Sequence, residues 1–385
     1  MKRYKVCLIS VARSDFSIIL PVFEAFNSSN ELEVSLVLSG MHMAPEFGNT
    51  YKDVLKSKIE PVAFIDHLIA SDSPTGVAKS IGVGILSYAD FFKNSKPDLI
   101  FLTGDRAEMF AAGAAAVPFG IPIAHIHGGE TTEGAIDEVF RHSITKMSSL
   151  HFVTNEVYAR RVRQLGECPD TVFVSGAPAL DNLTKFKRAK NSVIREKFGI
   201  DLTGQPILAT LHPETYDLDK SVNNLKAIIE ALQFFDKQVV FTASNADARG
   251  REINDLIKEE VEKRRSWLFC ENLSTEAYYT LLGSASVMVG NSSSGIIEAA
   301  SFDLDVINVG DRQKGRIKGE NVIDVAANSM IIKNAIDKVL KRLAERGKIK
   351  LNNPYFNGGA ADIIKKQTLL CLRKGIKLQK RFFDF

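Results

Sequence analysis

Short runs of apolar residues alternate along the chain with longer amphipathic stretches. Most of these runs are continuously apolar and rich in β-branched residues, as in LIFLT at 99–103, which is typical of parallel strands covered on both faces. In the first half the pattern predicts strands at Tyr4–Val11, Leu32–Leu38, Pro61–Ile65, Asp98–Thr103, Pro122–Ile126, Leu150–Thr154 and Val172–Ser175. Helices are expected between them at Phe16–Asn27, Pro45–Lys56, Thr75–Asn94, Ala107–Phe119 and Asp137–Ser148.

The same alternation restarts after a charged segment at 181–198, which predicts a helix and a connection between two domains. Further strands are expected at Ile207–Leu211, Val239–Thr242, Trp267–Cys270, Val287–Val289 and Val306–Val309. The helices between them are expected at about Leu218–Phe235, Ala248–Arg264, Thr275–Ser284 and Gly295–Phe302. The expected fold class is therefore α/β, with two Rossmann-like, doubly wound domains over 1–180 and 181–365 around a cleft that is the default ligand site.

The last segment, residues 366–385, is basic and amphipathic. We expect it to form a helix that returns to the first domain, and a surface for a partner is the alternative.

The composition is that of an ordinary globular protein, with 385 residues of which 45% are hydrophobic and 25% charged. Lys and Arg number 49 and Asp and Glu 46, so the net charge is +3, which provides no broad field for a nucleic acid or a membrane surface. The sequence has no apolar run of about 18 residues, and its beginning is typical of a first strand rather than a signal peptide.

Several familiar ligand motifs are absent from the sequence. It has no Walker-type phosphate loop, its one G-x-G lies inside a helical pattern, and no His or Cys residues have zinc-site spacing. Neither a metal nor a cofactor is therefore expected. The four cysteines lie far apart, which fits reduced thiols and predicts a cytoplasmic protein.

A candidate site in the first domain begins directly after the run LIFLT. Gly104, Asp105 and Arg106 follow this strand at its carboxyl end, where doubly wound sheets bind ligands. A helix cap with a neutralising ion pair would use the same residue types, so both interpretations stay open here.

A second group of candidates follows the next strand. Four of the seven histidines lie between 125 and 151, and His127 is followed by a Gly-Gly turn. The residues after this turn are dense in titratable groups: Glu130, Glu133, Asp137, Glu138, Arg141 and His142. Asp137 and Arg141, and likewise Glu138 and His142, have the i,i+4 spacing of ordinary helical ion pairs, but such density after a strand end favours an acid–base site.

The second domain carries a candidate anion site. His212 lies in LHPET at the end of its first expected strand, and VMVGNSSSGIIEAASF at 287–302 runs from a buried strand through a Ser-rich turn into a helix. Backbone N–H groups, hydroxyls and the helix dipole would converge there on an anion, and Glu298 could accept two ribose hydroxyls. A Ser-rich helix cap is the simpler interpretation, although it needs only one serine. Together these features predict an enzyme that handles a nucleotide diphosphate ester.

These residues resemble the UDP-N-acetylglucosamine 2-epimerases. The matching elements occur in family order from about Lys5 to Val325: VARSDFS, GDR, GGE with DExxRHxITK, LHPET, GNSSSGIIEA and VGDRQKGRIKGENVI. The resemblance implies two Rossmann-like domains of the glycosyltransferase type B kind. The GDR and GGE patterns resemble the hydrolysing branch, which eliminates UDP to a 2-acetamidoglucal and adds water to give the C2-inverted free sugar. In bacteria that sugar, N-acetylmannosamine, feeds sialic-type acid synthesis.

The resemblance also implies roles for individual residues. It implies acid–base residues at Asp105, His127, Glu130 and Asp137, supported on the sugar side by Arg106, Arg141 and His142. It implies UDP-binding residues at Arg13, His212, Asn245, Arg251, Asn291, Ser292, Ser293, Gly295, Glu298 and Arg312. Sialic-type relatives read HIEGGE where this chain reads HIHGGE, so either His127 replaces the catalytic carboxylate or Glu130 does.

The substrate and the class of function each have an alternative. Enzymes that act on UDP-2,4-diacetamido-2,4,6-trideoxy sugars, in legionaminic-type pathways, share the HIHGGE form. A glycosyltransferase of the same fold would need an acceptor and would give no reason for the loop at 125–142, and a nucleotide-sugar sensor would need no acid–base groups. The resemblance implies a UDP-sugar substrate, UDP as a product and a homo-oligomer, dimer or tetramer, with neither nucleic acid nor membrane as a partner.

Overall fold

The computed structural model describes residues 3–45, 48–69, 71, 73–133, 135–214, 218–244 and 250–384, without the side chains of Leu218 and Arg251. The chain forms two compact units. Unit 1 comprises the described parts of 1–130, 137–185 and 355–385, and unit 2 comprises those of 131–136 and 186–354. A short segment at 131–136 therefore leaves unit 1 for unit 2 and the chain then returns.

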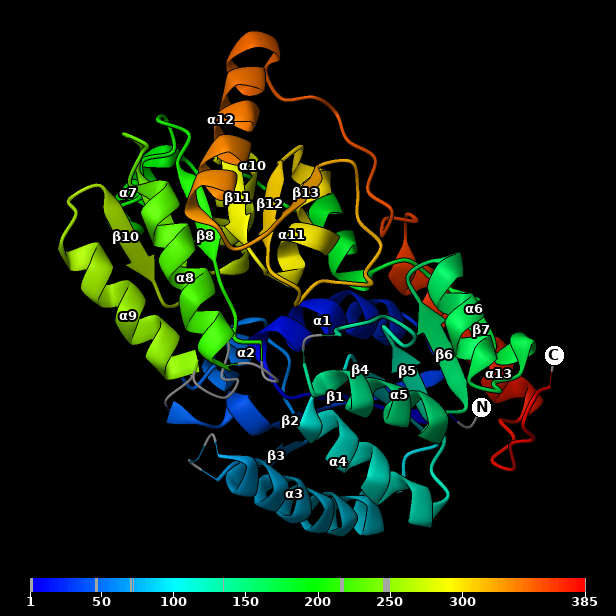
Figure 1. Ribbon diagram of the computed structural model, residues 1–385. Helices are drawn as coiled ribbons and strands as arrows, with labels where there is room; N and C mark the ends of the chain where they lie inside the picture. The colour runs from blue at the N-terminus through cyan, green and yellow to red at the C-terminus, as the bar shows by residue number, and fades with distance from the viewer. Residues whose placement is uncertain are drawn as a thin grey trace. The chain divides into compact units, whose positions relative to one another are not determined.

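Unit 1 is built on a seven-stranded parallel sheet of order β3-β2-β1-β4-β5-β6-β7 (Figure 1). Its strands are β1 Tyr4–Ser10, β2 Leu32–Ser39, β3 Ala63–Ile65, β4 Leu99–Thr103, β5 Ile123–Ile126, β6 Leu150–Val153 and β7 Val172–Val174. The order reverses between β1 and β4, which makes this pair the topological switch point of the sheet.

Helices cover both faces of this sheet. One apolar cluster joins the sheet to α1 Arg13–Asn27, α2 Tyr51–Lys56 and α13 Ala360–Lys374, and another joins it to α3 Pro74–Ser95, α4 Ala107–Ala116 and α5 Asp137–Met147. The remaining elements of unit 1 are α6 Glu156–Gln164 and the 3-10 turns η1 Gly40–His42, η3 Val117–Phe119, η4 Pro169–Thr171 and η5 Pro178–Thr184.

The C-terminal helix α13 completes the core of unit 1. It packs against α1, and its buried Ala361, Ile364 and Leu372 belong to the same apolar cluster as the first strands. The Asp181 carboxylate accepts hydrogen bonds from the backbone N–H groups of Ala360 and Ala361 at 3.1 and 2.7 Å, which caps the first turn of α13.

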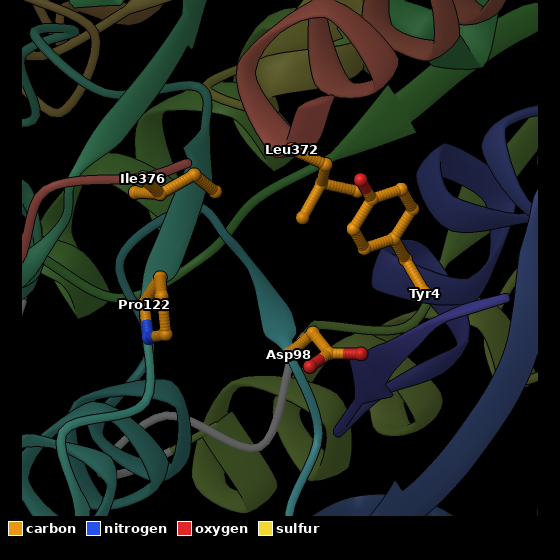
Figure 2. Close-up of a pocket in the computed structure, with 5 residues that line it drawn as sticks. All are labelled: Tyr4, Asp98, Pro122, Leu372 and Ile376. Carbon is orange, nitrogen blue, oxygen red and sulfur yellow. The ribbon is translucent and has the colours of Figure 1, made fainter. Parts of the chain in front are cut away.

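A pocket in unit 1 lies at the amino ends of the strands. It is lined by Tyr4, Asp98, Pro122, Leu372 and Ile376, which come from the starts of β1, β4 and β5 and from the end of α13 (Figure 2). The Asp98 carboxylate there accepts a 2.7 Å hydrogen bond from the Lys5 N–H, so it serves the backbone. The candidate residues follow the carboxyl ends of the strands, and this pocket is therefore separate from them.

Unit 2 repeats the architecture with a six-stranded parallel sheet of order β10-β9-β8-β11-β12-β13 (Figure 1). Its strands are β8 Ile207–Thr210, β9 Val239–Thr242, β10 Trp267–Cys270, β11 Val287–Gly290, β12 Val306–Val309 and β13 Val322–Val325. Its helices are α7 Asn191–Phe198, α8 Leu218–Leu232, α9 Gly250–Glu262, α10 Thr275–Ser284, α11 Ser293–Ile297 and α12 Ser329–Arg346, with the 3-10 turn η6 Ala299–Phe302. Helices α8, α9 and α12 share its main apolar cluster, and the switch point lies between β8 and β11.

The α/β class with two doubly wound parallel sheets is confirmed. Each expected strand is present; three have the predicted bounds, and the ends of the others differ by one or two residues. The helix expected at Pro45–Lys56 is shorter, since α2 begins at Tyr51. Helices α6 and α12 and strand β13 were not predicted. The residues of β13 are all partly or fully exposed, and its sequence VIDV lacks the continuous apolar run of a buried strand. Within the described residues, the helices are too short or too polar to cross a bilayer.

Candidate active site

Several of the candidate residues lie at the two switch points, and those from His127 to His142 follow the neighbouring strand β5. In unit 1 the chain leaves β1 into Val11–Asp15 and leaves β4 into Gly104–Arg106. In unit 2 it leaves β8 into Leu211 and His212 and leaves β11 into Asn291 and the serines that follow. Doubly wound sheets bind ligands at these places, where loops on neighbouring strands diverge to opposite faces.

Asp105 and Arg141 join two loops of unit 1. Arg141 lies on α5 and is 2% exposed, and its guanidinium donates to the Asp105 carboxylate and, at 2.9 Å, to the His127 carbonyl. A buried guanidinium requires a counter-charge and hydrogen-bond acceptors, and these two groups provide both. Arg141 therefore holds the loop after β4 beside the loop after β5.

His127 and Glu130 form a buried pair. The Nδ1 atom of His127 lies 2.6 Å from Oε1 of Glu130, and the Thr154 hydroxyl donates to the same oxygen at 3.4 Å. His127 has φ of 65°, a left-handed backbone conformation that is rare for residues with a Cβ and is common at functional sites. Its Nε2 is buried and has no hydrogen-bond partner in the described part of the chain, so Glu130 orients the ring and leaves this nitrogen available.

The turn after His127 depends on glycine. Gly129 has φ of 74°, and a Cβ on it would lie 2.6 Å from the Tyr158 carbonyl oxygen. Nearby, His125 Nε2 lies 2.8 Å from the Gly104 carbonyl oxygen, and burial lowers the pKa of His125 to about 3. This histidine is therefore neutral and structural, and it connects the ends of β4 and β5.

Asp15 and His42 are two further buried titratable residues near the same switch point, and the half-buried Arg106 pairs with Asp15. The Arg106 Nε lies 3.6 Å from Asp15 Oδ1, and burial raises the pKa of Asp15 to about 6, although Arg106 opposes this shift. His42 lies 2.8 Å from the hydroxyls of both Ser10 and Thr50, and burial lowers its pKa to about 4. Asp15 and His42 were not among the predicted residues, although Asp15 belongs to the VARSDFS element that follows β1.

The other candidates of unit 1 lie on helices. Arg13 is exposed and opens α1, and Asp137 is half-buried and opens α5. His142 Nε2 lies 3.1 Å from Glu138 Oε1, so the pairing that the i,i+4 spacing predicts is present.

In unit 2 Asn291 holds His212. The Asn291 side chain accepts from the His212 N–H at 2.7 Å and donates to the His212 carbonyl at 2.9 Å. The Asn291 carbonyl in turn accepts from Arg312 at 3.3 Å and from Gln313 at 2.8 Å. Asn291 thus ties the ends of β8 and β11 to the loop after β12, and its amide is occupied by the backbone of His212.

The Ser-rich turn of unit 2 leads into a hydroxyl network around Glu298. Ser292 caps α11 by accepting a 3.3 Å hydrogen bond from the Ser294 N–H. The Ser294 hydroxyl donates to Glu298 Oε2 at 2.5 Å, and the Tyr279 hydroxyl donates to Oε1 at 3.2 Å. Burial raises the pKa of Glu298, against the effect of these two bonds.

The network also contains Tyr278, whose hydroxyl donates to the Ser294 hydroxyl at 2.8 Å. Tyr278, Tyr279 and Ser294 were not predicted, because contacts between α10 and α11 leave no local sequence signal. Gly295 is buried, and a Cβ on it would lie 2.9 Å from Val306 Cγ1, so this glycine allows close packing. Ser293 is half-buried and opens α11.

Comparison with known proteins gives the family. The chain matches the family described as UDP-N-acetylglucosamine 2-epimerase over residues 24–368. The chain belongs to this family. A UDP-N,N′-diacetylbacillosamine 2-epimerase (hydrolyzing) of Legionella pneumophila is 33% identical over 358 residues, which are 93% of either chain. A GDP/UDP-N,N′-diacetylbacillosamine 2-epimerase (hydrolyzing) of Campylobacter jejuni is 34% identical over 86% of either chain.

The fold agrees with that of the 2-epimerase family. A crystal structure of UDP-GlcNAc 2-epimerase from Neisseria meningitidis bound to UDP-GlcNAc has a TM-score of 0.81 at 19% identity, over 95% of this chain and all of that chain. The names of both relatives include the word hydrolyzing, which agrees with the hydrolysing branch of the 2-epimerase family.

Two of the candidates suggested by the 2-epimerase resemblance lie wholly or partly outside the described residues. Asn245 is one of these, and Arg251 lies on α9 with its side chain outside the description. Among the described residues there is no cluster of three or more His, Cys, Asp or Glu side chains that could hold a metal ion.

Proposed function

We propose that this protein is a hydrolysing UDP-sugar 2-epimerase. In the proposed reaction the C2–H and C1–O bonds of a UDP-2-acetamido sugar break, a C1=C2 double bond forms, and UDP leaves. Water then adds its hydroxyl to C1, and C2 receives a proton on the face opposite to the one that lost its proton, which gives the C2-inverted free sugar. Family membership and the two hydrolysing relatives support this proposal.

The acid–base work is assigned to unit 1. The C2 proton is weakly acidic, so C1–O cleavage must lead and a base must lie beside C2. We assign proton transfer to His127 through Nε2, with Asp105 and Asp137 as the further acid–base residues. Glu130 then orients the imidazole and stabilises its charged form, as a carboxylate does in a His-based triad. The buried His127–Glu130 pair with an available Nε2 is the observation that carries this assignment.

The nucleotide is assigned to unit 2 and to Arg13. Cations and N–H donors stabilise a leaving diphosphate. Arg13, His212, Ser292, Ser293 and Arg312 are assigned this role. Glu298 would accept the ribose hydroxyls, with its carboxylate held in place by Ser294 and Tyr279.

Two UDP-sugars are candidate substrates. His127 in place of the usual glutamate, together with the names of the Legionella and Campylobacter relatives, favours UDP-2,4-diacetamido-2,4,6-trideoxyglucose. The family description favours UDP-N-acetylglucosamine, with N-acetylmannosamine as product. Either product would supply an enzyme that builds a nonulosonic acid. From the resemblance we also propose a homo-oligomer, dimer or tetramer, which light scattering would test.

An NMR time course with each UDP-sugar tests the function. We expect UDP and a free 2-acetamido sugar in equal amounts, with one deuterium at C2 when the reaction runs in D2O. An intact epimerised UDP-sugar would contradict hydrolysis. Turnover that depends on an added acceptor would indicate a glycosyltransferase, and binding without UDP release would indicate a sensor.

A further inference from the structure

The segment between Glu130 and Asp137 belongs to a different unit from these two residues. Glu130 and Asp137 lie in unit 1, whereas the described residues between them, 131–133, 135 and 136, belong to unit 2. Thr131 and Thr132 on this segment are buried, at 7% and 3% exposure. The chain thus carries Glu130, which orients His127, before a segment of the nucleotide-side unit, and the proposed acid–base residue Asp137 after it.

Arg316 holds this segment in unit 2. Its Nε donates to the Thr131 carbonyl at 2.8 Å, and its Nη2 donates to the Thr132 hydroxyl at 3.4 Å. The neighbouring Gly315 has φ of 77°, and a Cβ on it would lie 2.5 Å from Glu133 Oε1 and 2.9 Å from Thr131 Oγ1. The segment therefore lies directly against the backbone of the loop that carries Arg316.

The same loop is tied to the nucleotide-side residues. The Arg316 N–H donates to the Gln313 carbonyl at 3.4 Å, and the Gln313 side chain donates to the Asn291 carbonyl. Asn291 in turn holds both backbone groups of His212. An unbroken series of hydrogen bonds thus leads from His212 and the Ser-rich turn to Thr131, the residue next to Glu130.

We infer that Arg316 is a positioning residue, which couples the nucleotide-side loop of unit 2 to Glu130 and Asp137 through residues 131–136. This inference rests on the proposed function for the roles of those two residues. Arg316 suits the task because its planar guanidinium donates in two directions at once, whereas a lysine ammonium would hold one acceptor well. Nucleotide bound to unit 2 would then stiffen the segment and fix the side chains of Glu130 and Asp137.

The kcat and the UDP affinity of Arg316→Ala distinguish a positioning role of Arg316 from direct contact with the nucleotide. We expect kcat to fall by about 10- to 100-fold, as for a displacement of about 1 Å at a catalytic group, while the Kd for UDP by calorimetry stays within about threefold. Arg316→Lys should recover part of kcat. Lys314→Ala, an exposed cation on the same loop, is the control and should match the unmodified protein. A parallel loss of UDP affinity, or an unchanged kcat, would overturn the inference.

A second variant and a second measurement keep the inference testable if Arg316→Ala does not fold. Gly315→Ala should displace residues 131–133 and lower kcat with UDP affinity retained. Hydrogen exchange of peptides spanning 131–137 should slow when UDP binds the unmodified protein, and this protection should be lost in Arg316→Ala. Hydrogen exchange in these peptides at the same rate with and without UDP would refute the coupling. This measurement needs no turnover, so it decides the coupling even if no UDP-sugar is hydrolysed and the proposed function fails.

Discussion

The Nδ1 atom of His127 lies 2.6 Å from Oε1 of Glu130, while Nε2 of the same ring has no hydrogen-bond partner among the described residues. Glu130 thus holds Nδ1, and Nε2 is available for proton transfer. His127→Gln should lower kcat by about 10²- to 10⁴-fold, the usual contribution of a general acid–base residue. The measurement is UDP release under saturating substrate.

Glu130→Gln tests the partner in the same pair. The amide keeps the size of the side chain but loses the negative charge that stabilises a charged imidazole, so kcat should fall while KM changes little. Equal activity of Glu130→Gln and the unmodified protein would remove Glu130 from the mechanism. His127→Glu, assayed with both candidate sugars, asks whether the imidazole determines sugar choice.

Asp105 combines a proposed acid–base role with a bond to the buried Arg141. Asp105→Asn should abolish elimination, with kcat lower by at least about 10²-fold, while calorimetric binding of UDP stays nearly unchanged. The asparagine keeps an oxygen that can accept from Arg141, which limits structural damage. Full turnover by this variant would contradict the assignment.

Glu298 is assigned to nucleotide binding rather than to chemistry. Glu298→Ala should weaken UDP binding by about 10- to 100-fold, the value of one or two hydrogen bonds to a charged group. Tyr279→Phe is the matched control, because it removes one donor to Glu298 and leaves the carboxylate, and its effect should be smaller. A kcat defect in Glu298→Ala with normal UDP affinity would reverse the assignment.

The buried Asp15 should make stability fall as pH rises. Its pKa in the folded protein, about 6, lies above the ordinary value of 3.8, so folding takes up a proton between these values. The stabilising contribution is fully present below about pH 4 and is lost as pH rises through about 6. Asp15→Asn should remove this slope and raise the stability of unit 1 at pH 7 by about 3 kcal/mol, measured by urea unfolding.

Glu167 should behave in the opposite way. Burial opposes its ionisation, but contacts with His151, Lys146 and Lys380 outweigh this and lower its pKa to about 2, below the ordinary 4.5. Its contribution is present above about pH 4.5 and is lost as pH falls toward 2. Glu167→Gln should therefore destabilise unit 1 at pH 7, by about 3 kcal/mol, and make no difference near pH 2. A uniform loss at every pH would contradict this linkage.

The parts of the fold and site that the sequence predicts are those with local signals. Continuous apolar runs mark the buried strands, and glycine and charged residues just after β4 and β5 mark the carboxyl ends of these two strands. Arg141 shows where this reasoning ends. Its spacing along α5 indicates helical neighbours, whereas the structure shows it donating to Asp105, which lies on another loop.

The same limit explains the residues that were not predicted. Tyr279 reaches Glu298 because α10 packs beside α11, and Thr131 is bound by Arg316, which lies far along the chain. Such partners are set by tertiary packing, which pairs positions without regard to their separation in sequence. The motif residues were predictable, and the groups that hold them in place were not.

The place of α13 in unit 1 has a consequence for synthesis on the ribosome. Chains emerge from the amino end and domains often fold in that order. Here all of unit 2 emerges before Ala361, Ile364 and Leu372, which the core of unit 1 needs. Unit 1 therefore cannot complete its core until α13 has been synthesised, whereas unit 2, which is inserted within unit 1, can fold before that. A nascent chain of residues 1–354, stalled on a linker long enough to bring residue 354 out of the ribosome, should show unit 2 resistant to protease and unit 1 still open to cleavage.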